Sequence, residues 1–349
     1  MGPLFKALRE HRFLLYFSLA YMVAVSALAF ALGAKLQEFT RVLGYFISAD
    51  FFMLLYPVML LSVWLVRAAF SVREKNILLW LRAVMNRFDA QAVSFFRDGA
   101  FWGGVAGLAA LFPVDVFFCV GKSLIPHITT YRWDPLFAAW DRALHFGHYP
   151  HEFLMELAEK FDGAVIIDNL YLTWFLMVFL VQGWCLFADR DPVRRMRYLW
   201  TTVLSWIFIG TVMAALLASV GPIYHHDFYA GPSPYRDFLD DLRRAGDGRE
   251  LKVFSIANDL LKMVRDDTVV DLNAISAMPS LHVAIAFLSV LYFWSINKVL
   301  RAFALAYFFV ILAGSVLLGW HYAVDGYMSV AVVWLIWGLT GAALAKYGT

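Results

Sequence analysis

The sequence predicts an all-α integral membrane protein with about eight transmembrane helices. Hydrophobic residues make up 62% of the 349 residues, charged residues only 16%, and the mean hydropathy is +0.66. These values lie far from those of ordinary soluble domains. The chain also contains nearly uncharged runs of the length that a helix needs to cross a bilayer, about 20 residues.

Eight such runs can be read in order along the chain. They cover residues 13–33, 47–66, 99–121, 169–188, 198–220, 279–297, 302–320 and 322–345. The first run follows Lys6, Arg9 and Arg12, as the apolar part of a signal peptide would. Its apolar stretch exceeds the usual 7 to 15 or so residues of such a segment. We therefore expect an anchor that is retained.

The distribution of Lys and Arg predicts how the chain is oriented. With the N-terminus inside, the inner segments contain 16 basic and 6 acidic residues. The outer segments, 34–46, 122–168 and 221–278, contain 13 basic and 18 acidic residues. Because short cytoplasmic loops retain positive charge during insertion, both termini are expected in the cytoplasm. The net charge of +2 is too small to indicate a nucleic-acid partner.

Two segments outside the expected spans are amphipathic. Residues 67–98 are basic and read equally well as a helix on the inner surface or as a solvated linker. Residues 134–162 have apolar side chains at helical spacing, interleaved with His145, His148 and His151. A Gly-His-Tyr-Pro break keeps these histidines off one regular helical face. An interfacial helix is therefore favoured over a histidine metal site.

The stretch "AMPSLH" places polar residues at the start of an apolar run. Pro279 suits the first position of a helix, where its missing N–H costs nothing, and Ser276 is a candidate cap. The N-terminus of a helix exposes backbone N–H groups and the positive end of the helix dipole. Ser280, Leu281 and His282 therefore lie where a phosphate group is favoured.

The stretch "GWHYAVDGY" contains a second polar pair. His321 and Asp325 are four residues apart, which puts them on one face of a helix. A carboxylate that accepts a hydrogen bond from one ring nitrogen leaves the other nitrogen free to act as a nucleophile. Alone, His321 could instead be an interfacial histidine beside Trp320 and Tyr322. Both polar stretches, however, begin membrane helices at the same expected face.

At this point the sequence resembles a known family. "AMPSLH" and "GSVLLGWHYAVD" are similar to the second and third signature motifs of the type-2 phosphatidic acid phosphatase and haloperoxidase superfamily. Leu281, where many members have Gly, resembles the branch that includes inositol phosphorylceramide synthases. "ASVGPIYHHDFYAGPSPY" resembles the Gly-Pro segment of bacterial members of that branch. The resemblance covers about residues 168–345.

The resemblance implies a fold and a set of roles. Residues 99–349 would form a six-helix catalytic domain with outer loops 122–168 and 221–278, preceded by two added spans and a basic linker in residues 1–98. His321 matches the histidine nucleophile, Asp325 its orienting carboxylate and His282 the general acid. Ser280 matches the phosphate-binding serine, with Leu281 beside it.

Two elements of the family pattern are missing. Its first motif, a Lys followed seven residues later by Arg-Pro, has no match, and the Arg of its third motif falls on Ser315. A phosphoryl transition state needs positive charge around its oxygens. We expect the replacement to come from one of four basic residues of the outer loop: Arg236, Lys252, Lys262 or Arg265.

The function expected from these residues is cleavage of a phospholipid or lipid-phosphate ester at the outer face of the membrane. His321 attacks phosphorus, and the phospho group passes to water or to an acceptor hydroxyl of a polyol or lipid alcohol. No metal or cofactor is required. A bacterial inner membrane is the expected location. The alternatives are a transporter or channel that uses the same residues as a proton or ion relay, and an inactive scaffold of the same fold.

Overall fold

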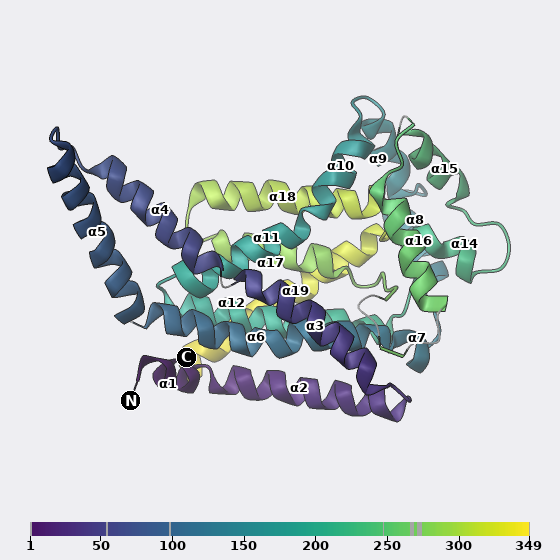
Figure 1. Ribbon diagram of the computed structural model, residues 1–349. Helices are drawn as coiled ribbons and strands as arrows, with labels where there is room; N and C mark the ends of the chain where they lie inside the picture. Colours follow the sequence, from purple (N-terminus) through teal and green to yellow (C-terminus); the bar gives the residue numbers. More distant parts are fainter. Residues whose placement is uncertain are drawn as a thin grey trace.

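The computed structural model describes residues 2–53, 55–97, 99–246, 248–265, 269–270 and 274–348, and within these ranges the side chains outside 45–55. All regular elements in the described ranges are helices. Figure 1 shows most of the long helices running side by side in an elongated bundle. This confirms the prediction of an all-helical fold in the described ranges.

Six helical spans in the described ranges are long and apolar enough to cross a membrane. Four are single helices: α2 (Arg12–Ala31), α6 (Ala100–Ser123), α18 (Lys298–Leu317) and α19 (Ala323–Tyr347). The fifth span combines α10 (Gly163–Leu172), α11 (Trp174–Gly183) and the π-helical η1 (Trp184–Ala188). The sixth combines α12 (Pro192–Leu204), the π-helical η2 (Ser205–Met213) and α13 (Ala214–Leu216).

The predicted count of eight spans is not confirmed, because two apolar helices are short. One is α4 (Leu55–Ser71) and the other is α17 (Leu281–Phe293), which has 13 residues. At about 1.5 Å per residue, α17 is shorter than the hydrocarbon core of about 30 Å. Most of its residues are buried, and it packs against both α18 and α19. The predicted span 279–297 is therefore a central helix enclosed by protein.

The N-terminal part adds α1 (Pro3–Glu10), α3 (Leu36–Met53) and α5 (Ile77–Arg97). Helix α5 lies within the segment 67–98, for which a helix and a solvated linker were both open, and the structure shows a helix. It pairs with α4, and the two extend away from the bundle (Figure 1). Several of its large apolar side chains are exposed: Ile77, Leu78, Leu79, Leu81, Met85 and Val93.

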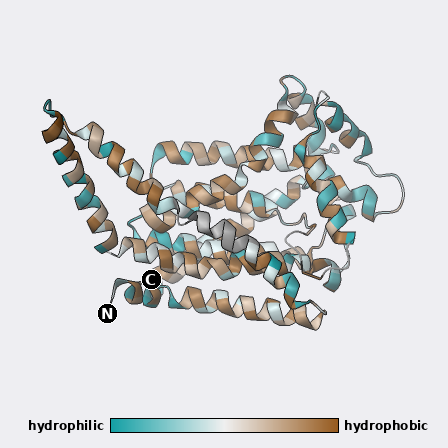
Figure 2. Cartoon of the chain, in the orientation of Figure 1, coloured by the Kyte–Doolittle hydropathy of each residue, from teal (hydrophilic) through white to brown (hydrophobic). Residues whose placement is uncertain are grey.

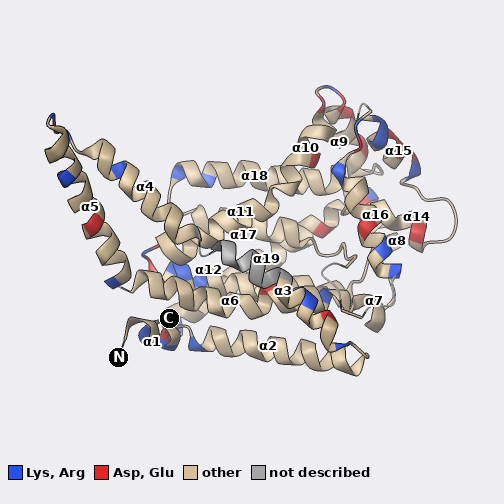
Figure 3. Cartoon of the chain, in the orientation of Figure 1, with Lys and Arg blue, Asp and Glu red and all other residues tan. Residues whose placement is uncertain are grey.

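One end of the bundle, called the loop end below, carries the short helices. They are α7 (Ile125–Ile128), α8 (Asp134–Leu144), α9 (Pro150–Ala158), η3 (Pro222–Tyr224), α14 (His225–Phe228), α15 (Arg236–Arg244) and α16 (Lys252–Arg265). Hydrophilic residues gather at this end (Figure 2), where acidic and basic side chains are mixed (Figure 3). Both termini lie at the opposite end (Figure 1). Helices α8 and α9 confirm the helical reading of residues 134–162.

Glycine lets α6 pack closely against its neighbours. A Cβ atom at Gly104 would lie 2.3 Å from the ring of Phe187 in η1. At Gly210 of η2 it would lie 2.5 Å from the ring of Phe118 in α6. Small residues at such crossings are how membrane helices gain van der Waals contact. The second crossing brings the loop end of α6 close to the start of α17, since the Leu281 side chain also lies against Gly210.

Candidate active site

The N-terminus of α17 forms one side of the site. Ser280 is the N-cap, and its buried hydroxyl oxygen accepts a hydrogen bond from the Val283 N–H at 3.4 Å. The helix therefore begins at Leu281, and the prediction of Pro279 as its first residue and Ser276 as its cap is wrong. The N–H groups of Leu281 and His282 have no acceptor within the helix. They form the positive end of the helix dipole, where an anion is stabilised.

The His321–Asp325 pair forms the other side. Nδ1 of His321 lies 3.2 Å from Oδ2 of Asp325, and both side chains are buried. His321 does not lie on the helix, as its spacing from Asp325 had predicted, because α19 begins at Ala323. The two meet because Asp325, in the first turn, reaches back and also accepts the Tyr322 N–H at 3.1 Å. The carboxylate thus fixes both the ring and the backbone beside it.

His282 completes the pair of imidazoles. Its ring centroid lies 6.3 Å from that of His321. The Trp174 ring packs against His282 at 4.5 Å and donates its N–H to the His282 carbonyl at 3.0 Å, and the Tyr171 ring stacks at 5.1 Å. These aromatic contacts hold His282 in a fixed orientation toward His321.

A loop between α13 and η3 ties the two sides together. Ser219 accepts the Ala277 N–H through its carbonyl at 2.9 Å and the Met278 N–H through its hydroxyl at 3.0 Å. Gly221 has φ of +83°, and a Cβ atom there would lie 2.4 Å from the Trp320 carbonyl oxygen. The segments before α17 and before α19 are therefore both set by this loop.

Replacing Gly221 with alanine tests this close approach. Gly231 also has positive φ, +94°, but open space around its Cβ position. Both Ala variants place a side chain at positive φ, which costs about 1–3 kcal/mol of backbone strain, whereas only Gly221→Ala pushes Trp320 and its neighbour His321. We expect a lower melting temperature and lower turnover for Gly221→Ala than for Gly231→Ala, measured in the same detergent. Equal behaviour of the two variants would contradict the packing described here.

Asp134 is a buried hydrogen-bond hub beside the site. Its carboxylate accepts the N–H groups of Val220 at 3.0 Å and Gly221 at 2.8 Å. It also accepts the hydroxyls of Tyr229 at 2.8 Å and Tyr322 at 2.9 Å. Tyr322 follows His321 directly, so one carboxylate joins the loop before η3 to the residue next to the imidazole. Sequence analysis missed this role.

Asp141 acts at the start of α19. Its carboxylate accepts the Ala323 and Val324 N–H groups, both at 2.9 Å. Burial raises the pKa of Asp141, and the two backbone N–H groups oppose that shift. Asp134 and Asp141 are seven residues apart on the buried face of α8. The i, i+7 spacing of two acids in an amphipathic helix is the sequence signal that could have found them.

The surroundings of His321 favour the neutral form of its ring. Burial lowers the pKa of His321, and the positive charge of Lys122 lowers it further, while a contact with the Ala277 carbonyl acts in the opposite direction. A neutral imidazole has a lone pair available for attack. Lys122, in the last turn of α6, was not among the residues singled out from the sequence.

The four basic residues named from the sequence lie elsewhere on the loop end. All have exposed side chains: Arg236, Lys252, Lys262 and Arg265. Three of them bind surface partners, with distances of 2.8 Å for Lys252 to Asn169, 3.2 Å for Lys262 to Asp259 and 3.0 Å for Arg265 to Asp227. Ser315, at the position of the missing third-motif Arg, is buried and donates to the Leu312 carbonyl. The surroundings of the four basic residues give no support to a role in phosphate binding.

His145 and His148 lie between α8 and α9, and His151 lies in α9. The three have different partners. His145 contacts the Asp141 carbonyl at 2.6 Å and the Tyr327 hydroxyl at 2.9 Å, and His148 pairs with Glu152 at 3.3 Å. His151 packs on an aromatic ring, and burial lowers its pKa to about 4. Among the described residues, no group of three or more His, Cys, Asp or Glu side chains could hold a metal ion.

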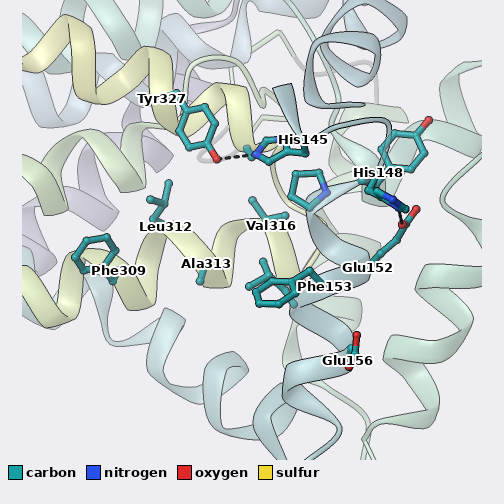
Figure 4. A pocket seen from close by; sticks show the side chains of 14 residues that line it. His145, His148, Glu152, Phe153, Glu156, Phe309, Leu312, Ala313, Val316 and Tyr327 are labelled. Carbon is teal, nitrogen blue, oxygen red and sulfur yellow. Dashed lines mark hydrogen bonds and ion pairs between the residues drawn. The ribbon is translucent and has the colours of Figure 1, made fainter. Parts of the chain in front are cut away.

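A groove of about 660 Å³ lies beside the start of α19. Figure 4 shows apolar side chains of α18 along one wall and His145, hydrogen-bonded to Tyr327, at another. Its polar side chains include no Lys or Arg. The apolar wall of α18 consists of Phe309, Leu312, Ala313 and Val316.

A comparison with known protein families identifies the family of the chain. Residues 136–339, more than half of the chain, match the family model described as PAP2 superfamily. The chain belongs to the PAP2 superfamily. The matched PAP2 segment contains Ser280, His282, His321 and Asp325, whereas Lys122 lies outside it. No curated protein and no solved structure gives a significant match.

Membership of the PAP2 superfamily supports a phosphoric ester phosphatase activity in general. Six apolar helices of membrane-spanning length support an integral membrane protein. Together they fit a lipid phosphatase with a lipid phosphate substrate in a bilayer.

Proposed function

We propose that this protein cleaves a phosphate ester of a membrane lipid through a phosphohistidine intermediate, as a phosphatase or phosphotransferase. The observation that carries the proposal is the buried His321–Asp325 pair, 3.2 Å apart, facing a second imidazole at the N-terminus of α17. In this arrangement one ring can attack phosphorus while the other handles the proton of the leaving group.

The first step forms a bond from the free ring nitrogen of His321 to phosphorus and breaks the bond from phosphorus to the lipid oxygen. His282 donates a proton to that oxygen, which leaves as an alcohol. Asp325 stabilises the positive charge that develops on the His321 ring. In the second step His282 removes a proton from the acceptor, whose oxygen attacks phosphorus and releases His321.

The phosphoryl oxygens are bound by the start of α17. Ser280, Leu281 and His282 supply the exposed end of the helix, where the dipole and the N–H groups favour negative charge. The scheme requires no metal or cofactor. It differs from a two-metal mechanism because imidazoles and helix N–H groups take the roles that metal ions have there.

The direct test is phosphate release by the purified protein from a panel of lipid phosphates and phosphodiesters in mixed micelles. We expect release from at least one lipid phosphate, with a radiolabelled histidine-bound intermediate trapped by rapid quenching. Absence of release and of labelling across the panel would favour the transporter or the inactive scaffold. A transporter would instead carry protons or ions across liposomes, for which these histidines would be relays.

We further propose that the loop end faces the outside of a bacterial inner membrane, with both termini in the cytoplasm. The charge distribution of the loops supports this orientation. It places the reactive residues at the depth of lipid headgroups, so that a lipid need not be extracted. The six-helix catalytic unit would comprise residues 99–349, with residues 1–98 as an added N-terminal part.

Cysteine labelling tests the orientation. In a variant without Cys119 and Cys185, single cysteines at Thr130 and Ala245 should react with an impermeant thiol reagent added to intact cells. A cysteine at Val193, at the opposite end of the bundle, should react only after the membrane is permeabilised. The reverse labelling pattern would place the active site in the cytoplasm.

The groove beside α19 suits a lipid chain. Its α18 wall is apolar, while His145 and Tyr327 give it a polar end near the site (Figure 4). A lipid lying there would have its acyl chain against α18 and its hydroxyl or ester groups near the two polar side chains. The absence of Lys and Arg from its lining favours an uncharged lipid alcohol over a second phosphate.

We propose transfer to a hydroxyl in preference to hydrolysis, in line with the inositol phosphorylceramide synthase-like branch. Partition of the phosphoenzyme depends on whether an alcohol is better oriented than water, and orientation can contribute several kcal/mol. The enzyme would be incubated with a labelled lipid phosphodiester, with and without inositol, other polyols or a lipid alcohol. A new phosphorylated product formed at the expense of hydrolysis supports transfer, and hydrolysis at an unchanged rate with every alcohol contradicts it.

A further inference from the structure

Lys122 is a cation in an unusual place. It lies in the last turn of α6, at the loop end, and its side chain is half-buried. Its ammonium nitrogen lies 6.0 Å from the centre of the Phe118 ring. Lys122 forms no ion pair with any acid in the part of the chain that the structure describes. Removing a charge from water without a partner is costly, so this position calls for an anion.

The path from Lys122 to the site is lined with aromatic rings. Phe118 packs on Trp206 at 4.6 Å, Trp206 lies 6.2 Å from Trp174, and Trp174 lies 4.5 Å from His282. On its other side Phe118 meets the Gly210 backbone, against which Leu281 also packs. The loop end of α6 and the first turn of α17 therefore pack against the same residue of η2, Gly210.

The charge of Lys122 acts on both reacting rings. It interacts electrostatically with His282 and with His321. The positive charge of Lys122 disfavours a protonated imidazole beside it, and of the two imidazoles Asp325 contacts only His321. An anion bound between Lys122 and His282 would offset this repulsion when His282 carries the proton of the leaving group. A phosphoryl group is such an anion, and it gains further negative charge on its oxygens in the transition state.

We propose that Lys122 binds a non-bridging phosphoryl oxygen and supplies the positive charge that the missing motif residues would otherwise provide. The inference rests on the proposed function. Lys122 comes from α6, a helix outside the segment that matches the family model, and so the cation reaches the same phosphate from a different part of the chain. The alternative is that Lys122 extends toward water and serves only the C-terminus of α6.

The test compares three variants in purified protein: Lys122→Met, Lys122→Arg and, as a matched control, the exposed Lys160→Met. Loss of a transition-state donor reduces turnover by about 10²- to 10³-fold. We expect that loss in kcat/KM for Lys122→Met, with a similar weakening of inhibition by orthovanadate, which mimics pentacoordinate phosphorus. Lys122→Arg should recover at least part of both, and Lys160→Met should match wild type.

Melting temperatures in detergent separate catalysis from folding. Removing a partly buried, unpaired charge should leave the melting temperature of Lys122→Met unchanged or raised. If Lys122→Met does not fold, Lys122→Gln is measured instead, and the same loss of kcat/KM and vanadate inhibition is expected. Wild-type kcat/KM and vanadate inhibition in either folded variant would overturn the proposal. A wild-type protein that neither releases phosphate nor responds to vanadate would overturn the proposed function itself.

Discussion

His321→Ala is expected to abolish turnover while the protein stays folded. A covalent mechanism has no substitute for its nucleophile, so neither water nor His282 can replace the lost ring nitrogen. Removing the ring also leaves Asp325 without its partner at 3.2 Å, although the carboxylate keeps the Tyr322 N–H. The measurement is kcat on the best lipid substrate, together with quenched-flow detection of the phosphoenzyme.

The matched control is His226→Ala, because the His226 side chain at the loop end is 59% exposed and pairs with Asp227. It should retain wild-type turnover and melting temperature. Undiminished activity of purified His321→Ala would end the phosphohistidine mechanism. Equal losses in both histidine variants would point to a general effect of disturbing the loop end.

His282→Ala is expected to reduce turnover by about 10²- to 10⁴-fold, the usual contribution of a general acid. The loss should depend on the leaving group. An alkyl alcohol of a natural lipid needs a proton, whereas a nitrophenyl group leaves as a stable anion and needs little help. We therefore expect the smallest loss with an aryl phosphate and the largest with the lipid, measured as kcat/KM.

The amount of phosphoenzyme that accumulates is a second test of the role of His282. The phosphoenzyme should still form from the aryl phosphate in His282→Ala but should be consumed slowly, because the same ring removes the proton of the acceptor. The variant would then accumulate labelled intermediate. An equal loss with every leaving group would instead indicate that His282 only packs against Trp174 and Tyr171, whose rings lie 4.5 and 5.1 Å from it.

Hydropathy predicts where the apolar helices of this protein lie better than it predicts how long they are. Residues 302–320 and 322–345 were expected spans and correspond to α18 and α19. Residues 279–297 were equally apolar, yet α17 has only 13 residues. Because a helix enclosed by other helices is as apolar as one in lipid, composition alone does not distinguish them.

Local spacing predicts the His321–Asp325 contact but not its geometry. The four-residue interval brought the correct partners together, while the helix begins only after both His321 and Tyr322. The role proposed for Lys122 could not be predicted from the sequence, because Lys122 in α6 and His321 before α19 come near each other only through tertiary packing. The only sequence signal for a phosphate-binding cation was positive charge in the outer loop, and the four basic residues chosen on that basis have exposed side chains.

The Asp134 hub also bears on how the protein is made. Asp134 and Tyr322 are 188 residues apart along the chain, so the carboxylate is synthesised long before the hydroxyl that it accepts. Until α18 and α19 have been inserted, the acid lacks one of its partners and the proposed nucleophile, His321, is not in place. Under the proposed mechanism, a nascent chain therefore cannot attack the lipids of the membrane into which it is being inserted. Reactivity begins only with the last helix, when the whole bundle has closed around it.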